Sequence, residues 1–286
     1  MNSILQARPK DALMDYLVRC NIAGIANTGY LESIAVDTIK YINSGFKVEL
    51  QTPIGKELEH KWYESLRFSP DYTVYGEDYY MGELWACWIA YSRKYLKALE
   101  QKNKLVDSDS TIAELMAPVS TVLDMGCGAG YTTAALLEIF PNARVIGTNM
   151  ADTVQFHIAN KMADEYGFEV VSSPFDIVEN VDFLFASEYF EHIADPIQHL
   201  VSVLEKLNPR YLYIANSFNG RAIGHFNNYP INGHTANGKQ TGNYFNKVLK
   251  FKGYQKIKTR LWNNRPALWK RIGKPQGGYK YEFPVL

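Results

Sequence analysis

Three glycines, Gly126, Gly128 and Gly130, directly follow an apolar segment that ends at Asp124, in the sequence VLDMGCGAG. Glycine has no Cβ atom, so it lets the backbone turn sharply and approach a ligand closely. A strand, a glycine loop and a helix in this order bind nucleotide-like ligands at the carboxyl edge of a parallel sheet. The spacing is G-x-G-x-G, and Tyr131 stands where a dinucleotide fingerprint has its third glycine. The sequence therefore predicts a nucleotide-like ligand other than NAD or FAD.

A second segment with chemically capable residues is ASEYFEHIADP, at positions 186–196. Its catalytic candidates are Glu188, Tyr189, Glu191 and His192. Histidine titrates near neutrality, so His192 could act as a general base. The alternative interpretation is that Glu191 and His192 cap or brace a helix.

Strands and helices alternate from about residue 119, after a hundred residues whose apolar positions largely repeat at helical spacing. This alternation predicts an α/β fold, a parallel sheet covered by helices on both faces, with an N-terminal helical extension. We divide the chain into an extension (1–104) and a ligand-binding domain (105–286). The expected strands are 120–125, 143–149, 168–173, 181–187, 209–217, 254–262 and 278–286; the expected helices among them are 132–140, 153–167, 196–207 and, after a Gly/Asn-rich loop, 243–253.

The glycine segment resembles motif I of the class I S-adenosylmethionine-dependent methyltransferases, and the resemblance runs from about Val119 to Tyr254. Residues 186–196 resemble the segment after strand four in the small-molecule O-methyltransferases of ubiquinone biosynthesis and their relatives. The resemblance implies a Rossmann-like, seven-stranded, mostly parallel sheet with an antiparallel last strand. It also implies S-adenosylmethionine as the cofactor.

The same resemblance implies which residues hold the cofactor. An acid normally accepts both ribose hydroxyls at the end of strand two, but this chain has Asn149 there. An amide lacks the charge-assisted bond, and neutral hydrogen bonds are roughly half as strong. Tyrosines of the segment 69–80 could close over the site, because aromatic rings stabilise cations such as a sulfonium; packing of the extension on the sheet is the alternative. The expected cofactor residues are Asp124, Gly126, Cys127, Gly128, Gly130, Asn149, Asp176, Tyr75 and Tyr79.

The E-x-x-E-H spelling also resembles the family that 2′-O-methylates small-RNA 3′ ends, where two acids and two histidines bind a divalent metal. Glu188 and His192 are four residues apart and would share a helix face, with Glu191 adjacent. His225 or His234 could supply a fourth ligand. We predict no metal, because the spelling is common without one in the wider methyltransferase family.

Charge is unevenly distributed, although the formal net charge is zero. Residues 1–205 carry 15 Lys and Arg against 29 Asp and Glu, whereas residues 206–286 carry 15 against Glu282 alone. The basic segment could bind nucleic acid, since cations neutralise phosphates and aromatic rings stack on bases. Alternatively it packs on the acidic part of its own chain or of a twin subunit, with its aromatic residues in the core. The aromatic residues concerned are Phe251, Tyr254, Trp262, Trp269 and Tyr279.

Three widely spaced cysteines indicate neither a disulfide framework nor a zinc site. No apolar run approaches the roughly 20 residues that span a bilayer, and the first residues lack the apolar core of a signal peptide. We therefore expect a cytoplasmic protein without a membrane partner.

The sequence favours a methyltransferase that acts on an oxygen or nitrogen of a small-molecule or nucleotide-like acceptor. One alternative is a metal-dependent RNA 2′-O-methyltransferase. Another is a methyltransferase-fold binding protein that has lost catalysis, which Asn149 favours and the intact glycine loop opposes.

Overall fold

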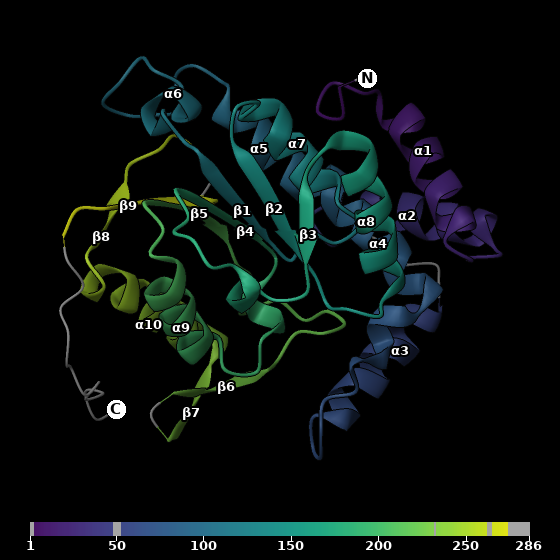
Figure 1. Ribbon diagram of the computed structural model, residues 1–286. Helices are drawn as coiled ribbons and strands as arrows, with labels where there is room; N and C mark the ends of the chain where they lie inside the picture. The colour runs from purple at the N-terminus through teal and green to yellow at the C-terminus, as the bar shows by residue number, and fades with distance from the viewer. Residues whose placement is uncertain (1–2, 48–52, 232, 262–264, 274–286) are drawn as a thin grey trace.

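A seven-stranded sheet forms the centre of the protein (Figure 1). The computed structural model describes residues 3–47, 53–231, 233–261 and 265–273. The strand order is β3-β2-β1-β4-β5-β9-β8, and β9 runs antiparallel to both of its neighbours. This confirms the predicted α/β, Rossmann-like architecture with its mostly parallel sheet. The strands are β1 (Thr121–Met125), β2 (Arg144–Thr148), β3 (Glu169–Val171), β4 (Phe183–Ser187), β5 (Tyr211–Ala215), β8 (Tyr254–Ile257) and β9 (Ala267–Arg271).

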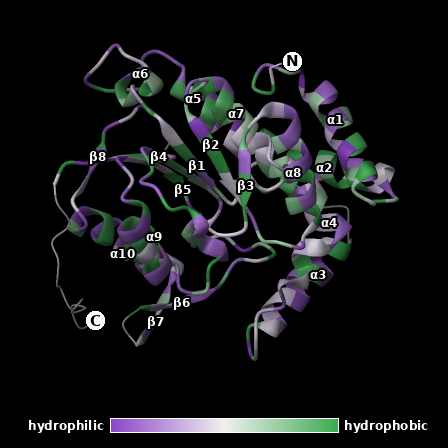
Figure 2. Ribbon diagram, in the orientation of Figure 1, coloured by the Kyte–Doolittle hydropathy of each residue, from purple (hydrophilic) through white to green (hydrophobic). Residues whose placement is uncertain are grey.

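Both faces of the sheet are buried, and the residue alternation along the strands shows how. In β4, Phe183 and Phe185 join one apolar cluster, with α7 (Tyr131–Ile139) and α8 (Val154–Tyr166). Leu184 and Ala186 join the other, with α9 (Pro196–Leu207) and α10 (Gly238–Phe251). Successive side chains of a strand point to opposite faces, so the near-continuous apolar strands require helices on both sides. Figure 2 shows the apolar residues concentrated on the central strands and the helix sides toward them.

Local signals fix several helix ends. Thr153 caps α8 by accepting from the Phe156 amide, and Asp195 caps α9 by accepting from the Gln198 amide. Such side-chain caps satisfy amides that have no partner within the helix. Gly167 and Asn208 end the two helices in the left-handed region.

The N-terminal helices pack on the sheet domain and share its core. The Tyr131 hydroxyl, at the start of α7, donates to Asp15 of α1 over 2.6 Å. Tyr16 stacks on Trp85 with their ring centroids 4.9 Å apart. The helices of this extension are α1 (Pro9–Ile22), α2 (Thr28–Asn43), α3 (Pro53–Ser65), α4 (Asp78–Cys87) and α5 (Arg93–Leu99), with α6 (Ile112–Met116) leading into β1.

The structure differs from the expected elements in three places. The segment 69–80, for which the sequence predicts no helix or strand, contains a 3₁₀ turn at Tyr72–Gly76 and the start of α4. The expected Gly/Asn-rich loop before 243 forms a hairpin, β6 (Asn228–Ile231) and β7 (His234–Asn237), and α10 begins at Gly238. The antiparallel strand beside β5 is Ala267–Arg271, whereas the predicted last strand, 278–286, lies outside the described residues.

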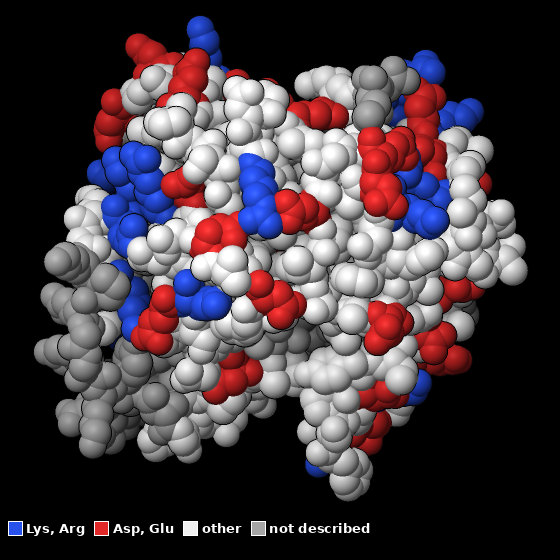
Figure 3. Space-filling view, viewed as in Figure 1, with Lys and Arg blue, Asp and Glu red and all other residues white. Residues whose placement is uncertain are grey.

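Two aromatic residues of the basic C-terminal segment, 206–286, pack in the core of the protein, as the second of the two interpretations of this segment expects. Tyr254 and Trp269 are buried in the core, so they cannot stack on bases. Trp262 and Tyr279 lie outside the described residues. Figure 3 shows Lys and Arg gathered near the β8–β9 edge, with acidic side chains close by; Lys252, for example, pairs with Glu205. Within the described ranges, no helix is both long and apolar enough to cross a bilayer.

Candidate functional site

The glycine loop lies at the carboxyl end of β1, between β2 and β4, where the sheet order reverses direction. Its three glycines have positive φ angles of 72°, 53° and 91°, at Gly126, Gly128 and Gly130 respectively. Residues with a Cβ rarely adopt this conformation. Added Cβ atoms would also come within 2.6 Å of Tyr189 at Gly126 and 2.9 Å of Leu84 at Gly128. The glycines are therefore required by the backbone and by close packing.

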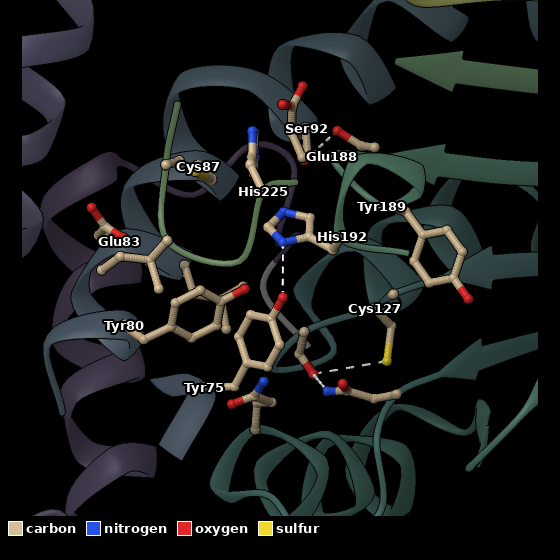
Figure 4. Close-up of a pocket in the computed structure, with 18 of the residues that line it drawn as sticks. Tyr75, Tyr80, Glu83, Cys87, Ser92, Cys127, Glu188, Tyr189, His192 and His225 are labelled. Carbon is tan, nitrogen blue, oxygen red and sulfur yellow. Dashed lines mark hydrogen bonds between the residues drawn. The ribbon is translucent and has the colours of Figure 1, made fainter. Parts of the chain in front are cut away.

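A cavity of about 890 Å³ opens above this loop and extends under the N-terminal helices. Figure 4 shows Cys127 and Tyr189 on one side of it, His192 and Tyr75 in the middle, and Glu83 on the far side. Most of the predicted site residues line it: Tyr75, Tyr79, Asp124, Gly126, Cys127, Gly128, Asn149, Glu188, Tyr189 and His192. Gly130, Asp176 and Glu191 are not part of the lining.

Two predicted cofactor residues brace the loop. Asp124 accepts hydrogen bonds from the hydroxyls of Thr132 and Thr133 in the first turn of α7. Burial raises the pKa of Asp124 to about 6, against the effect of these hydrogen bonds. Asn149 donates from Nδ2 to the Gly128 carbonyl over 2.7 Å, and its Oδ1 accepts from the Met150 amide. Asn149 thus already uses both polar atoms of its side chain within the protein.

Gln155, in the first turn of α8, lines the cavity and was not predicted from the sequence. Its side chain is 5% exposed, and its Oε1 has no hydrogen-bond partner in the described part of the chain. A buried acceptor without a partner is costly unless a ligand satisfies it. Asp176, by contrast, is exposed and accepts from the Ser172 hydroxyl, while Ser172 and Phe175 line the cavity. The adenine role of Asp176 stays a prediction.

His192 is held by the N-terminal extension. Its Nδ1 lies 3.0 Å from the Tyr75 hydroxyl, and a Cβ at Gly224 would come within 2.6 Å of that nitrogen. The His225 ring meets the His192 ring edge to face, with centroids 4.6 Å apart. Burial, assisted by His225, holds the pKa of His192 well below its usual value, so the imidazole is neutral at pH 7.

Glu188 follows β4 with a positive φ of 53°, which is unusual for a residue with a side chain. Its Oε1 accepts from Arg265 Nη2 over 2.7 Å. Burial and the neighbouring Glu191 nevertheless raise the pKa of Glu188 to about 8. Two carboxyl groups beside one guanidinium therefore retain a proton near neutral pH. Arg265 had no signal in the sequence, since it acts only through this tertiary contact.

Glu191 has a different position from the other predicted catalytic residues. It is fully buried, and its Oε1 accepts from the Ser217 amide. Its backbone carbonyl accepts from the Tyr229 hydroxyl over 3.2 Å. These contacts fit the bracing alternative, and they argue against the predicted catalytic role. Tyr189 likewise donates to or accepts from His199 Nε2 over 3.0 Å while its ring covers Gly126.

The residues considered for a metal do not form a ligand set. Glu188 is paired with Arg265, and Glu191 points at the Ser217 amide. His225 Nδ1 lies 2.9 Å from the Gly220 carbonyl oxygen, within hydrogen-bond distance, and His234 lies on the exposed hairpin strand β7. Over the described ranges, no group of three or more His, Cys, Asp and Glu is arranged to hold a metal ion.

Comparison with known proteins places residues 123–212 in the family model described as a methyltransferase domain. Similar curated proteins are the trans-aconitate 2-methyltransferases of Rhodopseudomonas palustris (strain BisB5), 26% identical over 122 residues, and Azoarcus sp. (strain BH72), 25% identical over 117 residues. These matches cover 43% and 41% of this chain and 46% of each relative, so the chain spans about half the length of the curated relatives it matches.

Solved structures with a similar fold include the plantazolicin methyltransferase BpumL in complex with a pentazolic desmethylPZN analog and SAH. That pair has a TM-score of 0.39 and 20% identity, over 57% of this chain and 60% of the other. The mitomycin 7-O-methyltransferase MmcR has a TM-score of 0.42 and 12% identity, over 94% of this chain and 74% of the other.

Residues 123–212 thus match a methyltransferase-domain model, and the sheet order agrees with the Rossmann-like fold expected from the sequence. The resemblance of residues 186–196 to the ubiquinone-type O-methyltransferases stays a prediction, since the similar curated proteins are trans-aconitate 2-methyltransferases.

Proposed function

We propose that this protein is an S-adenosylmethionine-dependent methyltransferase that acts on an oxygen or nitrogen of a small-molecule acceptor. One observation carries the proposal: the glycine loop and His192 line the same cavity of about 890 Å³. A cofactor above the loop and an acceptor beside His192 would therefore share one enclosed space.

The chain offers a suitable cradle for the cofactor. Gly126 and Gly128 both line the cavity, and the side chains of Tyr189 and Leu84 leave no room for a Cβ at either position. Gln155 Oε1 is a buried acceptor without a donor among the described residues, and we assign it to a ribose hydroxyl of the cofactor. Asn149 is the residue expected to bind the ribose, but its side chain already hydrogen-bonds to the Gly128 carbonyl. Glu188 follows β4 and lines the cavity, so its carboxyl oxygens can accept a hydrogen bond from the cofactor.

Bound S-adenosylmethionine supplies an electrophilic methyl group, so the protein has to position the acceptor and remove its proton. Positioning can contribute roughly 7–11 kcal/mol and a general base about 10²–10⁴-fold in rate. We assign the base to His192, which is neutral at pH 7. In the tautomer in which Nδ1–H donates to the Tyr75 oxygen, Nε2 keeps its lone pair for the acceptor proton.

Titration calorimetry with S-adenosylhomocysteine tests the proposal. The wild-type protein should bind it, and Gly128→Arg should not, because the arginine side chain would occupy the cradle under Leu84. Lack of binding by the wild type would remove the proposal. Binding without turnover on a broad acceptor panel would favour the binding-protein alternative, and full turnover in EDTA would exclude the metal-dependent RNA alternative.

A further inference from the structure

We propose that the acceptor carries a positively charged nitrogen, bound by Glu83 on the side of the cavity opposite Cys127 and Tyr189 (Figure 4). This inference rests on the proposed methyltransferase function and names its substrate class. Glu83 lies on α4, in the extension, and faces the cavity together with Cys87 and Tyr80 (Figure 4).

The charges that line the cavity favour a cation. The acidic lining residues are Glu59, Glu83, Asp124, Glu188 and Asp195, whereas the described cations are Lys56 and Arg221. Arg221 is largely exposed and pairs with Glu59 over 3.2 Å. Lys56 is also exposed, on α3. A polycarboxylate acceptor would meet Glu83 without a described cation beside it, so the trans-aconitate class named for the relatives does not suit this part of the cavity.

The Glu83 carboxyl has no counter-ion in the part of the chain that the structure describes. No hydrogen bond or ion pair from Lys or Arg reaches it, and Glu59 adds further negative charge nearby. Burial raises the pKa of Glu83 to about 7, although the interaction with the Tyr79 hydroxyl acts in the opposite direction. A protonated amine placed there would restore the carboxylate form and supply the missing charge.

Two further oxygens at this end could share the same ammonium group. Thr38 Oγ1 and the Tyr79 hydroxyl both belong to cavity-lining residues that are more than nine-tenths buried. Thr38 Oγ1 has no hydrogen-bond partner among the described residues, whereas the Tyr79 hydroxyl interacts with the Glu83 carboxyl itself. They lie on the packed helices α2 and α4, and an ammonium has three N–H donors to satisfy.

Aromatic rings connect the Glu83 end with His192. Tyr80 lies beside Glu83, its ring centroid is 4.8 Å from that of Tyr75, and Tyr75 contacts His192. Rings of this kind pack on an apolar body and also stabilise a cation. The acceptor thus has a cationic end at Glu83, an apolar or aromatic body along the tyrosines, and its reacting atom at His192.

Binding measurements with matched probes test the inference. The probes are tyramine, an ammonium, and 4-hydroxyphenylacetate, a carboxylate of nearly the same shape, each titrated into the protein saturated with S-adenosylhomocysteine at pH 8. Wild type should bind tyramine at least tenfold more tightly. Glu83→Gln should reduce tyramine affinity about ten- to hundredfold, the usual effect of losing a charge-assisted hydrogen bond. Glu64→Gln is the matched control and should keep the preference, because Glu64 lies on α3, pairs with Arg67 and is outside the cavity lining.

The inference is overturned if the carboxylate binds as tightly as the amine, if tyramine does not bind, or if Glu83→Gln retains the preference. S-adenosylhomocysteine affinity reports separately on folding and on the proposed function. If the wild type does not bind that nucleoside, the proposed function fails. If it binds the nucleoside normally and shows no preference for the amine, the substrate class alone fails.

Discussion

The Tyr75 hydroxyl lies 3.0 Å from Nδ1 of His192, although 117 positions separate the two residues in the chain. The contact joins a 3₁₀ turn of the extension to the segment after β4. Gly224 allows it, because a Cβ there would come within 2.3 Å of the Tyr75 oxygen. The N-terminal extension therefore takes part in positioning the proposed base.

Replacing Tyr75 by phenylalanine should lower kcat about tenfold and leave the affinity for S-adenosylhomocysteine unchanged, since the hydroxyl fixes the tautomer and ring orientation of His192. His192→Ala should lower kcat by about 10²-fold or more. Tyr72→Phe is the matched control, because Tyr72 also lines the cavity and has no contact with His192 in the structure. Equal losses in the Tyr72 and Tyr75 variants would contradict the assignment.

Gly128→Ala should weaken S-adenosylhomocysteine binding about tenfold or more, because the new Cβ would meet Leu84 at 2.9 Å and the φ of 53° disfavours alanine. Gly167→Ala provides the control. Gly167 has a φ of 87° and open space around a Cβ, so that variant suffers similar backbone strain, about 1–2 kcal/mol, away from the cavity. Both variants should melt at lower temperature, and calorimetry should separate them. A Gly167 variant that loses the ligand to the same extent would indicate a global effect.

Much of the fold could be predicted because its signals are local. The apolar strands, the helix caps and the glycines with positive φ are set by neighbours in the sequence. The position of β9 could not be predicted in this way, because ALWKR becomes a strand through antiparallel pairing with β5. The same holds for the β6–β7 hairpin inside a segment rich in Gly and Asn.

The site residues also fall into those that the local sequence predicts and those that only the tertiary structure reveals. The glycine loop and His192 belong to recognisable segments, whereas Gln155, Glu83 and Arg265 have no local signal. These three residues are recognised as site residues only in the folded structure. Gln155 has a buried oxygen without a partner among the described residues, Glu83 is a buried carboxyl, and Arg265 pairs with Glu188 from a distant part of the chain. Glu191 shows the converse, since it belongs to a motif and yet braces a loop.

Gln155→Leu tests the proposed ribose contact. Loss of one hydrogen bond of about 0.5–1.5 kcal/mol should weaken 5′-methylthioadenosine binding by up to about tenfold. Binding of the 2′-deoxy and 3′-deoxy forms of that nucleoside to wild type identifies which hydroxyl contacts Gln155. The Gln155→Leu variant should bind the nucleoside that lacks this hydroxyl as tightly as it binds the parent nucleoside. Gln155→Glu should retain binding, because a carboxylate also accepts. Unchanged discrimination in Gln155→Leu would show that the ribose is held elsewhere.

Buried His225 should make the protein less stable as the pH falls. Its pKa is lowered, chiefly by burial, so between about pH 7.5 and 5.5 the unfolded chain binds more protons at this position than the native state. Stability therefore rises with pH in this window, by up to about 1 kcal/mol for this group. Asp124, Glu83 and Glu188 have raised pKa values and contribute with the opposite sign, so the test compares variants instead of absolute slopes.

Urea unfolding of wild type and His225→Gln at pH 7.5 and 5.5 measures this difference. The variant cannot titrate at this position, so on acidification wild type should lose more stability than the variant, by up to about 1 kcal/mol. His157→Gln, on the exposed face of α8, should follow wild type at both pH values. Parallel losses in wild type and His225→Gln would mean that His225 is protonated in the native state, and the neutral, closely packed His192–His225 pair would then have to be abandoned.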